Sequence, residues 1–586
     1  MANPLLQFFL RSSQVTDERG RRRGRAEPDG LVMPPEPPTT DVVFLVLRRM
    51  RTPIIMMILV FTVSVFGLVL IPGVDEAGNP SRLSVFDSFY FVSYTAMTIG
   101  FSEIVPFTSG QRMWVTAMIF ASVVTWAYAI GTVLTLLQDP SFQEALRVQR
   151  FRRRVRTIKE PFTIVAGFGL AGRQVCEQLD DEGLRFVVID RDLKRLDMLT
   201  NSSVPIDAPY LHADAAQSLT LRLAGLGRPN CTGVLALTGE DETNLAITMT
   251  ATMLRPDVKV MARCVARIVH ERMLDFSPDA VINAADRFGE YLLLAMRRPH
   301  VYQVLTWLMA PEGSPIPDVP DRLGEGRWVV CGAGGYARHL ASELGKAGLD
   351  TVIADPAAGH PDTTGSAGFV AATPNDILNM ALAEHVRRTH EEVFVAVRQR
   401  TDANTHTLRL MGVDSVFIPT DLIAAETLAR IVTPIFWEFI AHAFNQSDEW
   451  GRALITRIKR ACGTGTPDRV FITISPTSAP AVSRWLHQAP LTLGELLRHP
   501  DDHTKTMHVV PLQLVRDGVP QPLPEPHIAL QEGDSLLIAG RRSALHTLED
   551  TLHQDATVHY VATGEQLPAT WLWRKLVLRH RARKAR

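Results

Sequence analysis

Residues 95–103 read TAMTIGFSE, a short polar stretch that separates two apolar runs near the start of the chain. The first run is PIIMMILVFTVSVFGLVLIP (53–72) and the second is MWVTAMIFASVVTWAYAIGTVLTLL (113–137), and neither contains a charged residue. Each run is long enough, as a helix, to cross the roughly 30 Å hydrocarbon core of a bilayer. Because helices of soluble proteins are rarely uncharged over such a length, the sequence predicts two membrane spans.

The connection between the spans has the composition of a re-entrant loop. Its segment SVFDSFYFVSYTAM (84–97) is apolar but too short to cross a bilayer, which suits a half-helix that dips into the membrane. The following TIGFS (98–102) would be non-helical at that depth, where such backbone is tolerated only if protein or a water-filled cavity satisfies it. Four such loops around an axis would present rings of carbonyl oxygens that replace an ion's hydration shell. Two spans cannot enclose a pore, so the sequence predicts that several chains assemble around one axis.

The distribution of charge predicts the orientation of the chain and excludes some partners. Basic residues flank the outer ends of both spans, whereas the 73–112 connection holds only Arg82 and Arg112, so both termini are expected in the cytoplasm. The formal net charge of −1 over 586 residues gives no reason to expect a nucleic-acid partner. The five cysteines are scattered without a CxxC pair, which indicates a reducing compartment and neither a disulfide framework nor a cysteine-based zinc site.

The stretch PFTIVAGFGLAGRQVCEQLDDEGLRFVVID (161–190) reads as strand, glycine loop, helix and strand. Gly167, Gly169 and Gly172 form GxGxxG, in which the first glycine allows a tight turn and the second lets backbone approach a phosphate. The third permits close packing of helix on strand. Asp190 ends the second strand, where an acidic residue can accept a ribose hydroxyl. This combination predicts a Rossmann-type nucleotide-binding fold.

A second copy of the pattern lies at RWVVCGAGGYARHLASELGKAGLDTVIAD (327–355). Its Gly332, Gly334, Ala337 and Asp355 repeat the first copy 165 positions later, and further on DILN (376–379) repeats DETN (241–244) at an offset of 135. The two copies are therefore interpreted as homologous. The second is expected to have lost about 30 residues before Asp376.

The order of span, pore helix, TIGFSE and span resembles the pore of a potassium channel, whose filter reads T-V-G-Y-G. The two glycine-loop copies resemble the regulator-of-potassium-conductance (RCK) family, which contains TrkA-N and TrkA-C domains. The resemblance implies an all-α two-span pore-loop domain fused to α/β Rossmann-like RCK domains, assembled as a homotetramer. The implied filter consists of Thr98, Ile99, Gly100, Phe101 and Ser102.

Two positions of the implied pore carry open questions. Ser102 stands where the family has glycine, and a left-handed backbone there costs a non-glycine residue about 1–2 kcal/mol. We therefore expect an intact inner filter and a distorted outer site. Gly131 in the second span is either a gating hinge or a small residue that allows close helix packing.

The resemblance also implies a division of the chain. The expected parts are a disordered basic and Pro-rich tail (1–50), the pore domain (51–140), a basic gating linker (141–160), the first RCK N-lobe (161–310), a second, shortened N-lobe (326–446), a C-lobe (466–554) and a basic C-terminal tail (555–586). Each N-lobe would end in a helix that crosses to a partner subunit, RPHVYQVLTWLM (298–309) and TPIFWEFIAHAF (433–444).

Family members bind NAD(H), adenine nucleotides, cyclic dinucleotides or divalent cations, and the first copy keeps the complete cleft. The expected ligand is NAD(H) or an adenine nucleotide, held by Gly167, Phe168, Gly169, Leu170, Ala171, Gly172, Asp190, Arg191, Asp214 and Arg263. The second copy lacks one side of the cleft and suits packing. A Ca²⁺ site at Asp214, Glu240 and Glu242 is the alternative to a solvated acidic turn.

These inferences predict a ligand-gated K⁺ channel, not an enzyme, in the plasma (inner) membrane of a prokaryote. Ligand binding to the cytoplasmic ring would act on the spans through the basic linker. Two alternatives stay open at this point. One is a weakly selective or non-selective cation channel, because of Ser102. The other is a membrane-anchored, NAD-dependent redox sensor or enzyme, against which the re-entrant loop argues.

Overall fold

The structure is a computed structural model that describes residues 42–74, 80–97, 99, 108–201, 207–310, 313–318 and 322–566. These residues form two compact units, one before and one after the boundary between Ile158 and Lys159. The first unit is all-helical apart from a two-stranded hairpin, and the second contains the sheets.

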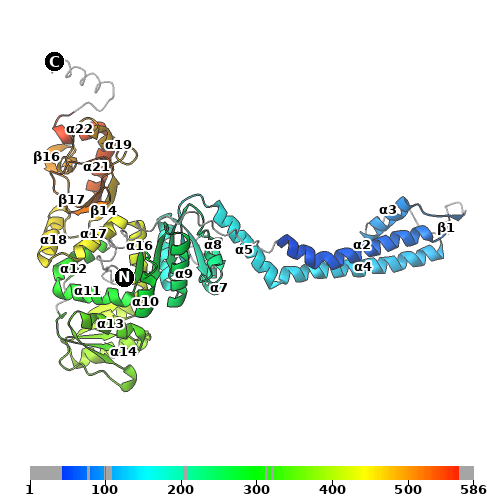
Figure 1. Cartoon of the computed structure of the whole chain (residues 1–586), viewed down its shortest axis with the longest axis horizontal. Helices are drawn as coiled ribbons and strands as arrows, with labels where there is room; N and C mark the ends of the chain where they lie inside the picture. The colour runs from blue at the N-terminus through cyan, green and yellow to red at the C-terminus, as the bar shows by residue number, and fades with distance from the viewer. Residues whose placement is uncertain are drawn as a thin grey trace, which may run out of the picture. The chain divides into compact units, whose positions relative to one another are not determined.

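Two long helices and one short helix make the first unit. Helix α2 (Val42–Leu70) packs along α4 (Ser109–Gln138), and α3 (Val85–Ala96) lies against both, as Figure 1 shows. The hairpin of β1 (Gly73–Val74) and β2 (Pro80–Ser81) follows α2, and α5 (Pro140–Thr157) follows α4. The small core of the unit consists of Val65, Leu68, Phe91, Val92, Tyr94 and Met118.

Local chemistry fixes where these helices begin and how closely they pack. The hydroxyl of Ser84 accepts a hydrogen bond from the Asp87 N–H (3.0 Å) and caps α3, and Thr108 does the same for α4 through the Gln111 N–H (3.3 Å). At Gly67 a Cβ would lie 2.1 Å from the ring of Trp114, so only glycine lets α2 and α4 approach there. The indole of Trp114 also donates to the Ser64 carbonyl (3.2 Å).

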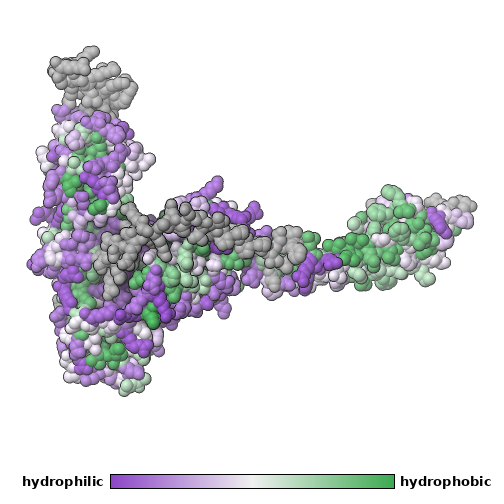
Figure 2. All heavy atoms as spheres, in the orientation of Figure 1, coloured by the Kyte–Doolittle hydropathy of each residue, from purple (hydrophilic) through white to green (hydrophobic). Residues whose placement is uncertain are grey.

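The outer surface of the two long helices is apolar. Val46–Leu70 and Ser109–Gln138 are long and apolar enough to cross a membrane, by length and composition. Figure 2 shows hydrophobic residues covering this unit, and they include Ile58, Phe66 and Phe120, which are 60%, 58% and 69% exposed. An exposed apolar surface of this extent requires lipid or further protein around it.

The first α/β domain of the second unit has a six-stranded parallel sheet in the order β5-β4-β3-β6-β7-β8, the doubly wound order of a Rossmann fold. Its central strand β3 reads FTIVA and is buried along its whole length, as expected where helices cover both faces of a parallel sheet. In chain order its elements are β3 (Phe162–Ala166), α6 (Leu170–Asp181), β4 (Arg185–Asp190), α7 (Leu193–Asn201), β5 (Tyr210–His212), α8 (Ser218–Leu223), β6 (Cys231–Ala236), α9 (Asp241–Leu254), β7 (Lys259–Arg263), α10 (Arg267–Leu274), β8 (Ala280–Ile282) and α11 (Ala284–Arg297).

The second α/β domain repeats this order with one strand fewer, β10-β9-β11-β12-β13. The strand equivalent to β5 is absent from this sheet. Its absence accounts for the fall, from 165 to 135, in the number of positions that separate equivalent residues of the two copies. Its elements are β9 (Arg327–Cys331), α13 (Gly335–Lys346), β10 (Asp350–Ala354), η2 (Pro356–Ala358), β11 (Gly368–Ala371), α14 (Asp376–Thr389), β12 (Phe394–Arg398), η3 (Asp402–Asn404), α15 (Thr405–Leu410), β13 (Ser415–Phe417) and α16 (Pro419–Val432).

The two α/β domains pack on each other reciprocally. Helix α11 of the first lies on α13 of the second, and the equivalent α16 of the second lies on α6 of the first. The helices α12 (Pro299–Met309), α17 (Pro434–Phe444) and α18 (Asp448–Cys462) join the same core. That the helix at 298–309 crosses to another subunit stays a prediction. Its apolar side chains are buried against α17 and α18 of the same chain, because the second copy supplies the partner surface.

The C-lobe is a four-stranded antiparallel sheet, β14-β19-β17-β18, with a β15-β16 hairpin and four helices. The tail predicted from residue 555 begins later, because α22 (Asp555–Thr563) buries Val558 and Val561 against α19 and α20. The tail predicted over 1–50 ends earlier, since α2 starts at Val42. The C-lobe elements are β14 (Asp468–Thr473), α19 (Pro480–Leu486), α20 (Leu493–Leu496), β15 (Arg498–His499), β16 (Asp502–Thr506), β17 (Val509–Arg516), β18 (Val519–Pro522), β19 (Ser535–Gly540), α21 (Arg542–His553) and α22.

Candidate functional site

The glycine loop of the first α/β domain adopts a backbone that only glycine supports at two of its three positions. Gly167 has φ +102°, and a Cβ there would lie 2.7 Å from the Thr238 nitrogen. A Cβ on Gly172 would lie 1.9 Å from the Gly167 oxygen. By contrast, a Cβ on Gly169, the N-cap of α6, would meet nothing closer than an Arg195 nitrogen at 3.8 Å. The loop is therefore open at Gly169, where unsatisfied N–H groups of a helix N-terminus favour an anion.

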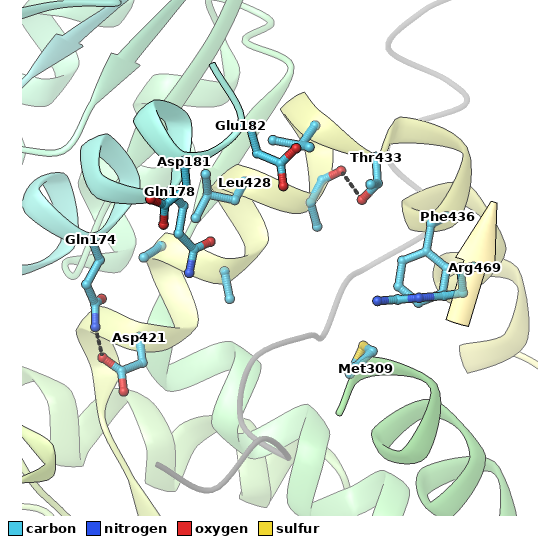
Figure 3. Close-up of a pocket in the computed structure, with 14 residues that line it drawn as sticks. Gln174, Gln178, Asp181, Glu182, Met309, Asp421, Leu428, Thr433, Phe436 and Arg469 are labelled. Atoms are coloured by element: carbon cyan, nitrogen blue, oxygen red, sulfur yellow. Dashed lines mark hydrogen bonds between the residues drawn. The ribbon is translucent and has the colours of Figure 1, made fainter. Parts of the chain in front are cut away.

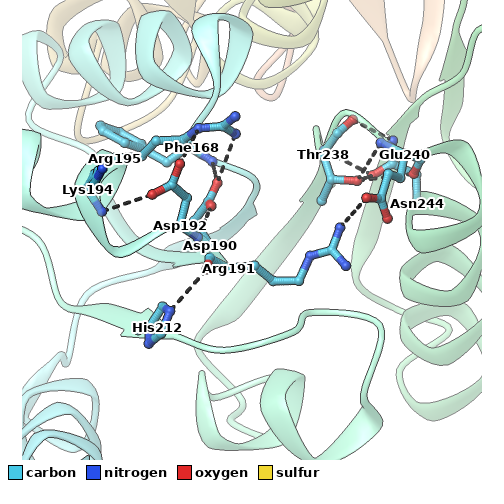
Figure 4. A network of polar contacts seen from close by, with 10 residues as sticks. All are labelled: Phe168, Asp190, Arg191, Asp192, Lys194, Arg195, His212, Thr238, Glu240 and Asn244. Atoms are coloured by element: carbon cyan, nitrogen blue, oxygen red, sulfur yellow. Dashed lines mark hydrogen bonds and ion pairs between the residues drawn. The ribbon is translucent and has the colours of Figure 1, made fainter.

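Asp190 lies at the end of β4 with its carboxylate turned onto the glycine loop (Figure 4). One carboxylate oxygen accepts the N–H of Phe168 (2.6 Å), and the other accepts the N–H of Asp192 (2.7 Å). The residue is 8% exposed, and the guanidinium of Arg195 stands 3.9 Å away. A carboxylate has about four acceptor positions, so a ribose hydroxyl would share Asp190 with these two donors.

An ion pair crosses the end of β3 above the loop. Arg191 follows β4 and Glu240 follows β6, the two strands that flank β3, and their side chains meet at 2.6 Å. The pair raises the pKa of Arg191 and lowers that of Glu240 from their usual values, through its hydrogen bond and charge. Both side chains are about half exposed, so the pair is weak and can open to a ligand. Figure 4 shows it facing the Thr238 and Asn244 hydrogen bonds.

Two further residues of the predicted cleft lie at the ends of strands that do not neighbour β3. Asp214 follows β5 and accepts the N–H of Ala216 (3.0 Å). Arg263 ends β7, two strands from β3. Burial lowers the pKa of its guanidinium, the charge of Asp241 raises this pKa, and the charge of Arg398 lowers it. The structure thus brings together the glycine loop, Asp190 and Arg191, whereas Arg263 lies beside the second α/β domain.

The carboxylates predicted to hold Ca²⁺ do not converge. Glu240 is paired with Arg191 and also accepts the hydroxyl of Thr243 (3.0 Å). The neighbouring Asp241 accepts the N–H groups of Val265 and Ala266, which ties α9 to the end of β7. Among the described residues these groups, with Asp214 and Glu242, do not form a cluster of metal-ligand spacing.

In the pore unit, Thr98, Gly100, Phe101 and Ser102 lie outside the described residues. The structure places Ile99 directly after α3, exposed, with its N–H donated to the Tyr94 carbonyl (2.9 Å). Gly131 lies in the unbroken helix α4, and a Cβ there would have no neighbour within 4 Å. Packing within the chain therefore does not require this glycine.

The second α/β domain has a different loop environment. Tyr336 stands where the first domain has Ala171, and the guanidinium of Arg398 lies over its buried ring, 4.5 Å from the centroid. Asp355 accepts the N–H of Ala357 (2.9 Å) and caps a short turn. With the β5 equivalent absent, β10 is the edge strand of the sheet. These features suit packing better than nucleotide binding.

Sequence reasoning missed a cluster of buried charges between the α/β domains. Glu426 of α16 is 1% exposed and forms ion pairs with Arg287 of α11 (2.7 Å) and with Arg430 (2.9 Å). Arg287 also pairs with Glu290 (3.0 Å), and Arg430 lies over the ring of Trp437. Glu426 lies 139 positions from Arg287, and no motif in either helix signals their pairing.

Two family profiles match the chain. Residues 54–139 match the ion channel family and residues 163–284 match the TrkA-N domain. The first match lies within the pore unit, and the second covers most of the first α/β domain. The chain thus carries an ion-channel segment followed by a TrkA-N domain.

Individual proteins match the chain over part of its length. The chain is 23% identical over 227 residues to Potassium channel protein 1 of Methanocaldococcus jannaschii, covering 39% of this chain and 67% of that protein. It is 24% identical over 191 residues to Voltage-gated potassium channel Kch of Escherichia coli, covering 32% and 43%. Across the first relatives the chain spans about a third to two thirds of the relatives' own length.

Solved structures are similar at lower identity. The GsuK channel bound to NAD is 12% identical with a TM-score of 0.38, and the alignment covers 87% of this chain and 99% of that chain. The two family matches and the relatives agree with the resemblance first seen in TIGFSE and GFGLAG. The chain is therefore similar to two-helix, pore-loop potassium channels with TrkA-N (RCK) domains, through its ion-channel match at 54–139 and its TrkA-N match at 163–284.

Proposed function

We propose that this chain forms a K⁺ channel in the plasma (inner) membrane of a prokaryote, as a homotetramer in which each copy supplies one filter loop. The observation that carries the proposal is the position of α3. This short capped helix packs between two apolar helices and ends at Ala96, directly before the Thr98 to Ser102 segment. A membrane anchor would need no such half-helix. Both termini would lie in the cytoplasm.

The regulatory ligand in this proposal is NAD(H) or an adenine nucleotide, bound at the first α/β domain. Support comes from the open N-terminus of α6 at Gly169, the buried Asp190 beside it, and the exposed Arg191 that a phosphate could attract from Glu240. Binding would act on the pore through α5, with Gly131 as the position where α4 bends. A ligand can open the gate only if it binds the open ring more tightly than the closed ring.

A matched pair of glycine variants tests the ligand site. Gly169→Ala adds a methyl group that meets no protein atom closer than 3.8 Å, so the fold should tolerate it while phosphate approach is hindered. We expect the Kd for NAD⁺ or ADP, measured by calorimetry on the detergent-solubilised protein, to rise about tenfold or more with an unchanged Tm. Wild-type affinity in Gly169→Ala would place the ligand elsewhere. Gly334→Ala in the second domain is the control and should change nothing.

Conduction is tested separately in liposomes. Purified protein should carry K⁺ current, and nucleotide should change its open probability in the wild type but not in Gly169→Ala. The second candidate, a weakly selective cation channel, is favoured by Ser102 in place of the family glycine. Reversal potentials in opposed K⁺ and Na⁺ gradients separate the two, because equal permeability would exclude the selective channel. Failure to conduct any cation would refute both.

A further inference from the structure

One of the two reciprocal interfaces between the α/β domains contains a cluster of metal-ligating side chains. Asp286 of α11 faces His339 and Glu343 of α13, and one ligand atom from each lies within 4.8 Å of the others. The imidazole Nε2 of His339 is hydrogen-bonded to the Asp286 carboxylate. The three side chains are between 9% and 15% exposed, so the group is largely shielded from bulk water.

The other interface is an internal control, because the repeat offsets place Asp421, Gln174 and Gln178 at the same three positions. Figure 3 shows the Gln174 amide donating to the Asp421 carboxylate, at 2.7 Å. An aspartate with an amide is thus sufficient to join these helices. The imidazole and the second carboxylate at the first interface are not required by the packing, and their presence there needs another reason.

An imidazole with two carboxylates is a ligand set for a divalent transition metal rather than for Ca²⁺, which prefers oxygen ligands alone. Bonds of 2.0–2.2 Å to a tetrahedral ion would bring the ligand atoms to about 3.3 Å from one another, which small side-chain rotations achieve from the present spacing. None of the three ligands is a cysteine, and the five free cysteines of the chain lie elsewhere.

The surroundings leave room for a further ligand. A cavity of about 340 Å³ opens on His339 and is also lined by Asp241, Gly335 and Ser342, which gives a water molecule access to the ion. Lys346 pairs with Glu343, but its side chain is 44% exposed and can turn into solvent when an ion replaces it.

We propose that Asp286, His339 and Glu343 form a binding site for a divalent transition metal of the Zn²⁺ type. The ion would join α11 of the first α/β domain to α13 of the second, and so would fix the packing of the two domains at one of their two interfaces. The site is separate from the glycine loop and does not depend on the chain conducting ions.

The loss-of-site experiment copies the natural control. Full-length protein in detergent is stripped with EDTA, dialysed and titrated with ZnCl₂ in competition with a chromophoric chelator. We expect one Zn²⁺ per wild-type chain, and at least about a hundredfold weaker binding in His339→Gln/Glu343→Gln, which gives this interface the side chains of the other. Equal Tm values of the stripped proteins establish that the variant is folded. Unchanged Zn²⁺ binding in the folded variant would overturn the proposal.

A gain-of-site experiment adds a second criterion. Gln174→His/Gln178→Glu gives the other interface the proposed ligand set, and Asp421 is already in place. We expect two Zn²⁺ per chain in this variant, with the Co²⁺ form showing twice the visible absorption of the wild type. Binding of a single ion would show that the side chains do not suffice at this helix interface. In the wild-type background, His385→Gln, in the stacked pair with His360, should leave the stoichiometry at one Zn²⁺ per chain.

Discussion

Removing the carboxylate of Glu426 should be among the most damaging single changes in the second unit. This side chain is 1% exposed and lies between the guanidinium groups of Arg287 (2.7 Å) and Arg430 (2.9 Å). Burial tends to lower the pKa of Arg287, but the charges of Glu426 and Glu290 outweigh it and raise that pKa above its usual value. In Glu426→Ala, Arg287 would keep its ion pair with Glu290, whereas Arg430 would lose the carboxylate with which it pairs. Breaking a buried ion pair in this way costs about 3–5 kcal/mol.

The cost converts into a measurable change of Tm. If the two α/β domains and the C-lobe unfold together, the entropy of unfolding implies a fall of about 3–6 °C for this loss of stability. Thermal unfolding can be followed by tryptophan fluorescence, since Trp307 and Trp328 are fully buried. An exposed pair gives the matched control: Arg484 and Asp555 meet at 2.7 Å with half-exposed side chains, so Asp555→Ala should cost no more than about 1 kcal/mol.

A triple variant separates charge from packing. Arg287→Met/Glu426→Leu/Arg430→Met removes the three most buried charged groups together and should come within about 1 kcal/mol of the wild type or exceed it, because the Glu290 carboxylate that is left is 14% exposed and can turn toward solvent. A Tm of Glu426→Ala equal to that of Asp555→Ala would refute the reasoning, since the Glu426 carboxylate would then not be needed to neutralise buried cations. If Glu426→Ala and the triple variant lower the Tm by the same amount, the loss of stability comes from packing and not from charge.

Three further outcomes are expected. Gly172→Ala should lower the Tm and abolish nucleotide binding together, because its Cβ would meet the Gly167 oxygen at 1.9 Å; a wild-type Tm would contradict this. Burial raises the pKa of Cys462 to about 11, so its thiol stays protonated at pH 8. Its alkylation by iodoacetamide should be on the order of a hundredfold slower than in the urea-unfolded chain and should rise about tenfold per pH unit up to pH 10, whereas equal rates would disprove the shift. Ser102→Gly should increase the K⁺ over Na⁺ permeability ratio in liposomes, and an unchanged ratio would mean that the serine is tolerated without cost.

The parts of the fold that depend on local patterns could be predicted from the sequence. Two uncharged apolar runs are sufficient to predict α2 and α4, and glycine spacing with alternating strand and helix composition is sufficient for two Rossmann-like sheets. The change of repeat offset also located the strand that the second sheet lacks. Such features depend on residues within about 30 positions of one another, where composition and turn chemistry act directly.

The parts that depend on distant pairs could not be predicted. The sequence leaves a cation site at Glu240 open because it cannot show that Arg191, 49 positions earlier, reaches this carboxylate across the end of β3. The helix at 298–309 has an apolar face that suits any partner, and only the folded chain shows that α17 and α18 cover it. Asp190 was expected to face a ribose, and its additional bond to the Phe168 N–H follows from loop geometry rather than from the motif.

Helix α6 connects the proposed ligand site to the packing of the two α/β domains. Its N-terminus begins at Gly169, where a phosphate would bind, and one turn farther on Gln174 is hydrogen-bonded to Asp421 of α16. Burial raises the pKa of Asp421 because it removes water from the carboxylate, and the hydrogen bond from the Gln174 amide partly replaces that water. A nucleotide that shifts α6 along its axis must therefore either carry α16 with it or break this bond. The equivalent helix of the second domain, α13, starts beside Tyr336 and Arg398 and meets α11 through the His339 cluster. In the proposed channel, nucleotide would act on one interface and a metal ion would hold the other, so the two ligands would bias the same pair of domains from opposite sides.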